Sequence, residues 1–558
     1  MKKKNRVWIS MVLSITCLLS QVYPVDARDV EKEKQSVYST DQFVNNEVLV
    51  KMKKSCSVTE RNRIFKKLNL SLVDEMDQYA VGKAATKGCL KNTVYSLEHN
   101  TYVELVQPNF EYQSQEAMYE ETYTSGDITF SQNQWALKND GTLKFTDRYA
   151  KEVVQGVNGM DLNVEPLWKA VKEKKSKTVV VAVIDSGIDI NHPALKGKIW
   201  VNKKEIHGDG IDNDENGYVD DYTGWNAYGY SDDLTDEMGH GTHCAGIIAA
   251  DGVDNVWGVT GKSNIKIMPI KVFCDKKDAK KGECTANSFS ILRGIKYAYY
   301  NGASVCSLSL GMTSNDEAIE SYMYSSKMLF VCAAGNSGES MEEEPIYPGI
   351  YRFPNVISVG NIRCDGKLHM TSSYSKKYVD VAAPGTEIYS TLPDSTYGFS
   401  TGTSMATPYV AGVAALLYSY SDKMCASSAK KQIVKNATKT SDLNGKVSSG
   451  LVNAYQAYKN DVSAPYIRYQ TTVYKQKGNA RVTLNVVDYG IAGVKYVRWL
   501  KGSNKVTAFK KGAKGYKVSA AGYFTAKSTG TYTIYAVDKK GNETIKKITV
   551  KIPAKKRS

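Results

Sequence analysis

The sequence predicts an α/β fold with a parallel sheet covered by helices on both faces, preceded by a small α+β segment and followed by an all-β sandwich. Three observations lead to this prediction. Apolar runs alternate with helix-like stretches in the middle of the chain, short strands and helices alternate before it, and strands of period two follow it. At 558 residues the chain is also too long for one compact core, which favours several domains.

The first residues have the pattern of a secretory signal peptide. Lysines and an arginine at positions 2–6 precede an apolar run at 7–19, and Val25-Asp26-Ala27 offers small residues for cleavage. The apolar run is shorter than the stretch that a stable membrane anchor needs. We therefore expect residues 1–27 to be a signal peptide and the protein to be secreted, with an uncleaved anchor as the alternative.

Residues 28–125 are expected to form a separate α+β unit. Strand-like NEVLVKM and YVELVQPNFEYQ flank the charged, helix-like stretch SVTERNRIFKKLNL. An independent N-terminal binding domain is the alternative interpretation. The junction at its end, residues 114–128, is polar and contains Gly and Ser, as segments open to proteolysis do.

Residues 130–460 carry the apolar runs of the predicted parallel sheet. Asp185 and Asn336 each come directly after such a run, and open α/β sheets place ligands at the carboxyl ends of their strands. These two residues are therefore candidates for a functional site. The runs are VVVAVID (179–185), IKIMPIKVF (265–273), ASVCSLSL (303–310), LFVCAA (329–334), VISVG (356–360) and YVDVAA (378–383).

Residues 463–558 are expected to form an immunoglobulin-like β-sandwich. RVTLNVVD and GTYTIYAVDKKGNETIKKITVKI alternate with period two and contain Lys-Gly and Gly-Asn turns. Residues 461–558 hold 21 Lys+Arg and 4 Asp+Glu, a net charge of +17, whereas the whole chain has +15. The basic character of the protein therefore belongs to this module, which suits an anionic cell wall or membrane surface. A nucleic-acid partner is not expected, because the chain is predicted to be exported and has no nucleic-acid motif.

Three short motifs hold the side chains needed for nucleophilic catalysis. They place Asp185 in VAVIDSGID (181–189), His240 in GHGTHCAG (239–246) and Ser404 in STGTSMATP (400–408). A serine hydroxyl is a poor nucleophile near neutral pH, so it needs an adjacent base, which in turn needs an orienting carboxylate. Ser404 is also predicted to begin a buried helix, where free backbone N–H groups suit a developing oxyanion. A helix cap without catalytic role is the alternative for Ser404, and a metal-binding His240–His243 pair is the alternative for the histidines.

The segment GTSMATP and the order Asp, His, Ser resemble the subtilisin-like serine peptidases (subtilases) over roughly residues 130–460. The resemblance implies a secreted endopeptidase that acts on protein or peptide substrates without a catalytic cofactor. Ser404 would form the acyl-enzyme, His240 would act as base, Asp185 would orient it, and Asn336 would donate to the oxyanion. VQPNFEYQ resembles the end of the inhibitory pro-segments of this family, so the chain's own pro-segment is an expected intramolecular inhibitor.

The resemblance also implies substrate-binding residues. Ser309, Leu310 and Gly311 resemble the edge strand that pairs with the substrate backbone, and Ala333, Ala334 and Gly335 resemble a wall of the first specificity pocket. An acidic loop at 339–345 either favours basic residues near the scissile bond or is a solvated surface loop. Two questions of function remain open. The first is whether the chain is an enzyme or a catalytically silent wall-binding scaffold. The second is whether such an enzyme would be a dedicated processor of peptide precursors or a broad nutrient-degrading protease.

The segment 209–221 resembles a calcium loop. Asp212, Asp214 and Asn216 have the alternate spacing of an EF-hand, but Thr223 stands where that loop needs a bidentate Glu, and Asp220 or Asp221 is expected to substitute. We expect structural calcium bound by Asp212, Asp214, Asn216 and Asp220, with an Asx-rich turn as the alternative.

The ten cysteines do not define a pairing scheme. Cys17 would leave with the signal peptide, and Cys89 lies in the expected pro-segment. Cys274 and Cys284 bracket one loop and are the best candidates for a disulfide, whereas Cys244 is expected to be a small buried packing residue.

Overall fold

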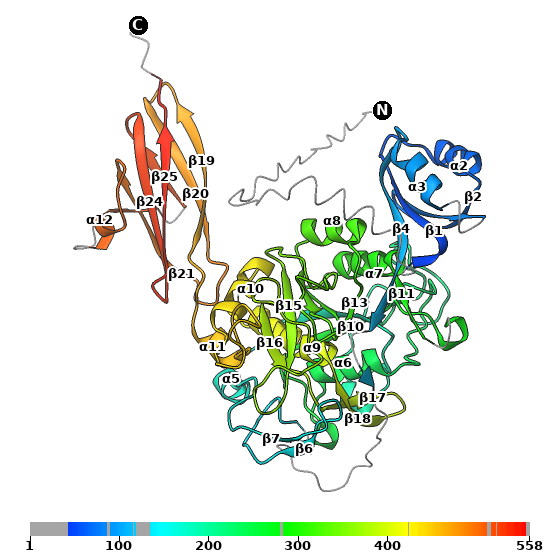
Figure 1. Ribbon diagram of the computed structural model, residues 1–558. Helices are drawn as coiled ribbons and strands as arrows, with labels where there is room; N and C mark the ends of the chain where they lie inside the picture. Colours follow the sequence, from blue (N-terminus) through cyan, green and yellow to red (C-terminus); the bar gives the residue numbers. More distant parts are fainter. Residues whose placement is uncertain are drawn as a thin grey trace. The chain divides into compact units, whose positions relative to one another are not determined.

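A computed structural model describes residues 43–85, 90–114, 117–118, 134–279, 283–421, 423–510, 515–519 and 522–553 (Figure 1). The expected signal peptide, Cys17, Cys89 and most of the junction 114–128 lie outside these residues. In the part of the chain that the structure describes, no helix combines the length and apolar character needed to cross a bilayer.

The N-terminal α+β unit is an antiparallel sheet with two helices (Figure 1). Its four strands follow the order β4-β1-β3-β2, and the chain order βαββαβ makes the arrangement ferredoxin-like. Leu49, Tyr79 and Val81 are buried in one cluster with Phe289 and Leu292, so the sheet packs against the central domain. The elements are β1 (Phe43–Met52), α2 (Val58–Lys67), β2 (Leu70–Met76), β3 (Tyr79–Ala84), α3 (Leu90–Glu98) and β4 (Val103–Ser114).

The predicted parallel sheet is confirmed. Seven strands follow the order β16-β15-β14-β12-β8-β10-β9, and each neighbouring pair is parallel. Side chains alternate between the faces of a sheet, and almost all residues of these strands are buried, so both faces are covered. The strands are β8 (Val179–Asp185), β9 (Trp225–Asn226), β10 (Ile265–Lys271), β12 (Val305–Leu308), β14 (Leu329–Ala333), β15 (Val356–Ile362) and β16 (Val381–Pro384).

Two of the covering helices hold a candidate functional residue in their first turn. Helix α6 (His240–Ala249) and helix α9 (Thr403–Ser419) pack against each other and on the sheet (Figure 1). All of α6 and nearly all of α9 are buried, because both consist of small and apolar residues. The other α-helices of the central domain are α5 (Glu165–Val171), α7 (Ser288–Tyr300), α8 (Glu317–Ser325), α10 (Ala426–Lys435) and α11 (Ala454–Lys459).

In the residues that the structure describes, the C-terminal region is all-β apart from the short helix α12 (Thr507–Lys510). Its antiparallel strands form two sheets, β19-β20-β23 and β22-β21-β24-β25. A hydrophobic core of its own, which includes Ile467, Val482, Phe524 and Ile534, lies apart from the large central core. The strands are β19 (Tyr466–Tyr474), β20 (Asn479–Val487), β21 (Val494–Lys501), β22 (Tyr516–Lys517), β23 (Tyr523–Ala526), β24 (Gly530–Asp538) and β25 (Glu543–Val550).

Candidate active site

The end of strand β8 brings Asp185 to the first residue of helix α6. The side chains of Asp185 and His240 are buried, and His240 Nδ1 lies 2.5 Å from Asp185 Oδ1. A Cβ atom on Gly241 would lie 2.1 Å from the carbonyl oxygen of Gly187, so only glycine lets the helix approach the strand end this closely. The pairing with an imidazole stabilises a carboxylate that would be costly to bury alone.

Asp236 supports this pair and was not singled out from the sequence. Its Oδ1 accepts hydrogen bonds from the Ser186 hydroxyl at 2.7 Å and the Gly239 N–H at 2.9 Å. Its Oδ2 accepts from both the hydroxyl and the N–H of Thr242. Asp236 therefore ties the turn after β8 to the first turn of α6. Burial raises the pKa of Asp236. The role of this residue is visible only in the three-dimensional arrangement, because acidic residues before a helix are common in sequences.

Ser404 lies in the first turn of α9, next to the same pair. Its hydroxyl donates to the Ser309 carbonyl at 3.1 Å, and the Ser309 hydroxyl donates to the Ser404 carbonyl at 2.9 Å. Cys244, one turn after His240, links the two helices. Its sulfur lies 3.6 Å from the Ser404 carbonyl oxygen and within 4.8 Å of a carboxylate oxygen of Asp185 and a ring nitrogen of His240. The structure thus gathers the three motif residues at the carboxyl end of the sheet.

Asn336 follows strand β14 and faces the start of α9. Its Oδ1 accepts hydrogen bonds from the N–H of Thr403 at 3.0 Å and from the Thr403 hydroxyl at 3.1 Å. These bonds orient the amide and leave its NH₂ group as the donor end, beside the residue that precedes Ser404.

The expected edge strand is occupied by the N-terminal unit. Leu310 and Gly311, which form β13 (Leu310–Gly311), pair antiparallel with Ser114 and Gln113 of β4. Further along, β5 (Ala117–Met118) pairs with β18 (Thr396–Thr401), whose end lies just before Ser404. The N-terminal unit thus adds a strand to each side of the candidate site.

The expected wall residues Ala333, Ala334 and Gly335 are buried directly before Asn336. Gly335 has φ +112°, and a Cβ atom there would lie 2.6 Å from Ile346. The acidic loop that follows is exposed at all four of its glutamates, Glu339, Glu342, Glu343 and Glu344. Glu342 accepts hydrogen bonds from the hydroxyls of Ser340 and Ser375, as expected for a surface loop.

Polar side chains hold the N-terminal unit at two helix starts. Gln107 and Tyr112 donate to the two carboxylate oxygens of buried Asp316, which also caps helix α8. The Phe110 N–H donates to the Ser288 hydroxyl at the start of α7, and the Asn109 side chain accepts the Phe289 N–H.

His243 is buried and does not take part in the candidate site. Its Nε2 lies 3.0 Å from the Ile388 carbonyl and 3.2 Å from the Gly398 carbonyl, so it holds two strands together. Burial is the main cause that lowers its pKa from 6.5 to about 4. Burial also lowers the pKa values of His192 and His369.

We expect acid to destabilise the fold through His243. Between pH 6.5 and pH 4 the unfolded chain binds a proton that the native chain does not, so the stability present above pH 6.5 is lost as the pH falls toward 4. The pKa of about 4 corresponds to about 3 kcal/mol of unfolding free energy. Chemical denaturation of a Ser404→Ala chain at about pH 7 and about pH 4.5 measures this loss. His243→Gln should make the difference smaller; an equal pH dependence in both chains would contradict the assignment.

The predicted calcium loop forms a carboxylate cluster with a different membership. Glu205, which the sequence spacing did not suggest, has a carboxylate oxygen within 4.8 Å of oxygens of Asp212 and Asp214. Glu205 Oε2 and Asp214 Oδ1 are buried without a hydrogen-bond partner, as ligand oxygens for a cation would be. The other two expected ligands have different contacts: Asp220 accepts three backbone N–H groups, and Asn216 donates to Asp221.

The cysteine pair favoured from the sequence is not a disulfide in this structure. Cys274 and Cys284 are both thiols. Burial first, and then the neighbouring Cys274 thiol, raise the pKa of Cys284 to about 11, so the two side chains lie close together. Cys244 is buried within the central core, as expected.

Comparisons with known proteins identify two regions of the chain. Residues 176–455 match the profile of the Subtilase family, and residues 30–109 match that of the fervidolysin N-terminal prodomain. A thermophilic serine proteinase from Bacillus sp. (strain AK1) is 29% identical over 468 residues, which are 82% of this chain and 99% of that protein. Thermitase from Thermoactinomyces vulgaris is 37% identical over 287 residues, which are 50% of this chain and 87% of that protein. The crystal structure of fervidolysin from Fervidobacterium pennivorans, a keratinolytic enzyme related to subtilisin, has a similar fold. It is 20% identical with a TM-score of 0.54 and covers 91% of this chain and 76% of that one.

Proposed function

Because the chain belongs to the subtilase family and is a subtilisin-like serine protease with a prodomain, we propose that it is a secreted endopeptidase whose nucleophile is Ser404. One observation carries the assignment of residues. The buried Asp185–His240 pair, with 2.5 Å between its nearest atoms, lies beside the helix start that holds Ser404. Asn336 reaches the same helix start from the neighbouring strand.

In the proposed reaction the Ser404 Oγ attacks the carbonyl carbon of the scissile peptide bond while His240 takes the hydroxyl proton. Asp185 stabilises the imidazolium that forms. The Asn336 NH₂ group and the backbone N–H of Ser404 donate to the oxyanion. The C–N bond then breaks, His240 gives its proton to the leaving amine, and water hydrolyses the acyl-enzyme by the same steps.

Labelling with a serine-directed fluorophosphonate tests this function. The processed protein is expected to gain one covalent label on Ser404, because only an activated serine attacks the phosphorus centre. A processed form that takes no label would instead support the catalytically silent scaffold.

We further propose that the pro-segment, expected at residues 28–125, inhibits the enzyme until it is removed. Strand β4 pairs with Leu310 and Gly311, the edge that a substrate backbone would use, and hydrogen bonds to Asp316 hold it there. The proposed layout is a signal peptide at 1–27, this pro-segment, a catalytic domain at 130–460 and a basic immunoglobulin-like sandwich at 463–558. Two antiparallel sheets with a core of their own support the last assignment.

We propose that the first cut falls between the two paired strands. Leu310 pairs with Ser114, and Ser309 directly precedes Leu310 in the chain. The Ser309 carbonyl is the group that the Ser404 hydroxyl contacts. On the other side Ala117 pairs with Thr401. The two pairings flank the start of α9, so we propose that the pro-segment ends between Ser114 and Ala117 and not at residue 125.

We expect the first processed form to begin after Ser114 and no later than Ala117. Intact mass and N-terminal sequencing of the earliest product from freshly refolded precursor measure this directly. A first product that begins beyond residue 125 would show that the paired strands are not the substrate of the initial cleavage.

We propose calcium at Glu205, Asp212 and Asp214. Three carboxylates supply the hard oxygen ligands that calcium prefers, and two of their oxygens are buried without a partner. When bound, calcium would supply positive charge that stabilises this acidic insertion between β8 and α6. It would take no part in peptide hydrolysis.

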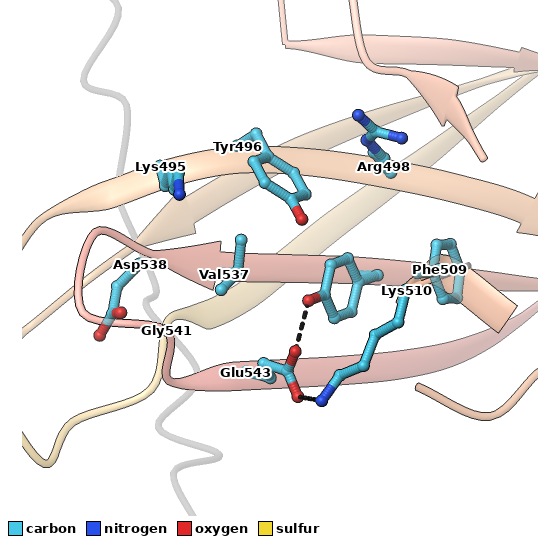
Figure 2. Close-up of a pocket in the computed structure, with 10 residues that line it drawn as sticks. Lys495, Tyr496, Arg498, Phe509, Lys510, Val537, Asp538, Gly541 and Glu543 are labelled. Atoms are coloured by element: carbon cyan, nitrogen blue, oxygen red, sulfur yellow. Dashed lines mark hydrogen bonds and ion pairs between the residues drawn. The ribbon is translucent and has the colours of Figure 1, made fainter. Parts of the chain in front are cut away.

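We propose that the basic C-terminal module attracts an anionic cell-wall or membrane surface. A cavity of about 320 Å³ lies on its four-stranded sheet, and Figure 2 shows the basic side chains Lys495, Arg498 and Lys510 at its edge with Tyr496 and Phe509. Attraction by such a surface depends on salt, so retention on purified cell walls should fall between low and high ionic strength.

A further inference from the structure

Three aspartates converge at one end of the C-terminal module. Asp461 lies just after α11, Asp488 just after β20, and Asp538 at the end of β24. One carboxylate oxygen from each lies within 4.8 Å of one from each of the others. Their exposed fractions are 8%, 5% and 0%, so all three charges are withdrawn from water.

This arrangement opposes the charge of its surroundings. Residues 461–558 hold 21 Lys+Arg and only 4 Asp+Glu, and three of these four acids form the cluster. The fourth, Glu543, has an ion pair with Lys510 and a hydrogen bond from Tyr535 (Figure 2). None of the three aspartates forms an ion pair with a basic side chain anywhere in the described residues, although basic residues are abundant. Like charges buried together are costly unless a counter-charge joins them.

The backbone satisfies some of the carboxylate oxygens. Asp461 accepts the N–H groups of Ser463, Ile491 and Ala492. A Cβ atom on Gly490 would lie 2.3 Å from Asp461 Oδ1, so glycine is required for the loop to close over this carboxylate.

Asp538 also has donors: it accepts from the backbone N–H of Lys540 and from both the N–H and the side chain of Asn542. Asp488 has a hydrogen-bond donor for only one of its two carboxylate oxygens. Its Oδ1 accepts the Gly490 N–H at 2.8 Å, whereas Oδ2 is buried and has no hydrogen-bond partner.

The hydroxyl of Ser463, whose N–H is bonded to Asp461, is a further buried oxygen without a partner. Oxygen atoms without donors in a buried acidic cluster are what a cation ligand set looks like before the cation is added.

We propose that Asp461, Asp488 and Asp538 bind a calcium ion. The potential ligands are all oxygens, with no histidine or thiol among them, which favours a hard cation over zinc or copper. Calcium also tolerates irregular carboxylate sets, whereas magnesium demands near-octahedral geometry and keeps its water. This site is separate from the carboxylates of Glu205, Asp212 and Asp214 in the catalytic domain.

The cation would connect three parts of the chain: the segment before the module, the loop after β20 and the turn after β24. Asn542 donates to the Asp461 carbonyl, and Ser421, two residues after α9, donates to the Gly490 carbonyl. Calcium would thus stabilise the loop after β20, the turn after β24 and the connection at Asp461 as one unit.

Hydrogen–deuterium exchange with and without calcium tests the site locally. The full chain with Ser404→Ala avoids self-digestion, and it is compared in EDTA, in CaCl₂ and in MgCl₂. At a calcium concentration about 100 times the dissociation constant, we expect amide exchange in peptides covering residues 461–466, 488–493 and 538–543 to slow by up to about 100-fold. Magnesium should slow it much less.

Asp488→Asn is the decisive variant. It removes the unpartnered oxygen and one negative charge while keeping the shape, so the calcium effect in these peptides should disappear. In EDTA the variant should be at least as protected as its parent, because charge repulsion is relieved; this outcome also shows that it folds. Asp214→Asn, in the catalytic-domain cluster, is the matched control and should keep the effect. Calcium protection that is absent from the parent, or that persists in Asp488→Asn, would overturn the proposal.

Discussion

Replacing Ser404 with alanine is expected to lower kcat by about 10⁶-fold, the magnitude known for loss of the serine in subtilisin. The change removes only Oγ, which donates to the Ser309 carbonyl, so the fold should be kept. Without the nucleophile no acyl-enzyme forms, and the remaining rate comes from substrate binding and oxyanion donors alone. The precursor should also accumulate with its pro-segment attached. Hydrolysis of a peptide substrate and the mass of the purified chain measure both effects.

Ser419→Ala is the matched control, because Ser419 lies in the last turn of the same helix and donates to the Leu416 carbonyl. Its activity should stay near that of the parent. Should Ser404→Ala process itself at the parent's rate, another nucleophile would have to be sought.

Local sequence was enough to predict the candidate catalytic residues. Asp185, His240 and Ser404 each lie in a short motif of small residues, and glycines such as Gly241 permit the close approach that brings α6 to β8. The parallel sheet was equally predictable, because its strands are apolar on both faces and leave a continuous apolar signal.

Residues that act across long sequence separations could not be predicted in this way. Glu205 joins Asp212 and Asp214 from outside the EF-hand spacing that drew attention to the loop. Asp236 supports the Asp185–His240 pair by accepting hydrogen bonds from Ser186 and Thr242. These two residues lie close together only because of the way helix α6 packs on the sheet. These contacts are products of tertiary packing, so no periodicity or motif in the sequence records them.

The contacts of the pro-segment show the same limit. The sequence suggested an inhibitory segment from its last strand, but Asp316 lies about 200 residues from Gln107 and Tyr112. Asp316 therefore caps helix α8 and also binds the pro-segment, and the second contact exists only when the two domains are packed together. Similarly, Asp461, Asp488 and Asp538 come from the segment before the C-terminal module, the loop after β20 and the end of β24.

Asp185→Asn is expected to lower kcat by about 10⁴-fold while changing KM little. The carboxylate lies 2.5 Å from His240 Nδ1 and is buried, so its charge acts on the ring with little screening by water. An amide has nearly the same shape but no charge. It cannot stabilise the imidazolium that forms when the Ser404 proton is taken, and its NH₂ group favours the tautomer with the proton on the wrong nitrogen.

The rate of fluorophosphonate labelling separates this effect from a loss of substrate binding, because the small reagent needs the activated serine but not the peptide-binding edge. We expect the labelling rate and kcat to fall together in Asp185→Asn. Asp189→Asn, in the turn after the same strand, is the matched control: Asp189 accepts the Asn191 N–H and should leave both rates near those of the parent. A fall in kcat with unchanged labelling would place Asp185 in substrate positioning and not in activation of Ser404. The buried Asp185–His240 pair predicts the opposite, since the carboxylate contacts the imidazole, whereas the peptide is proposed to pair with β13.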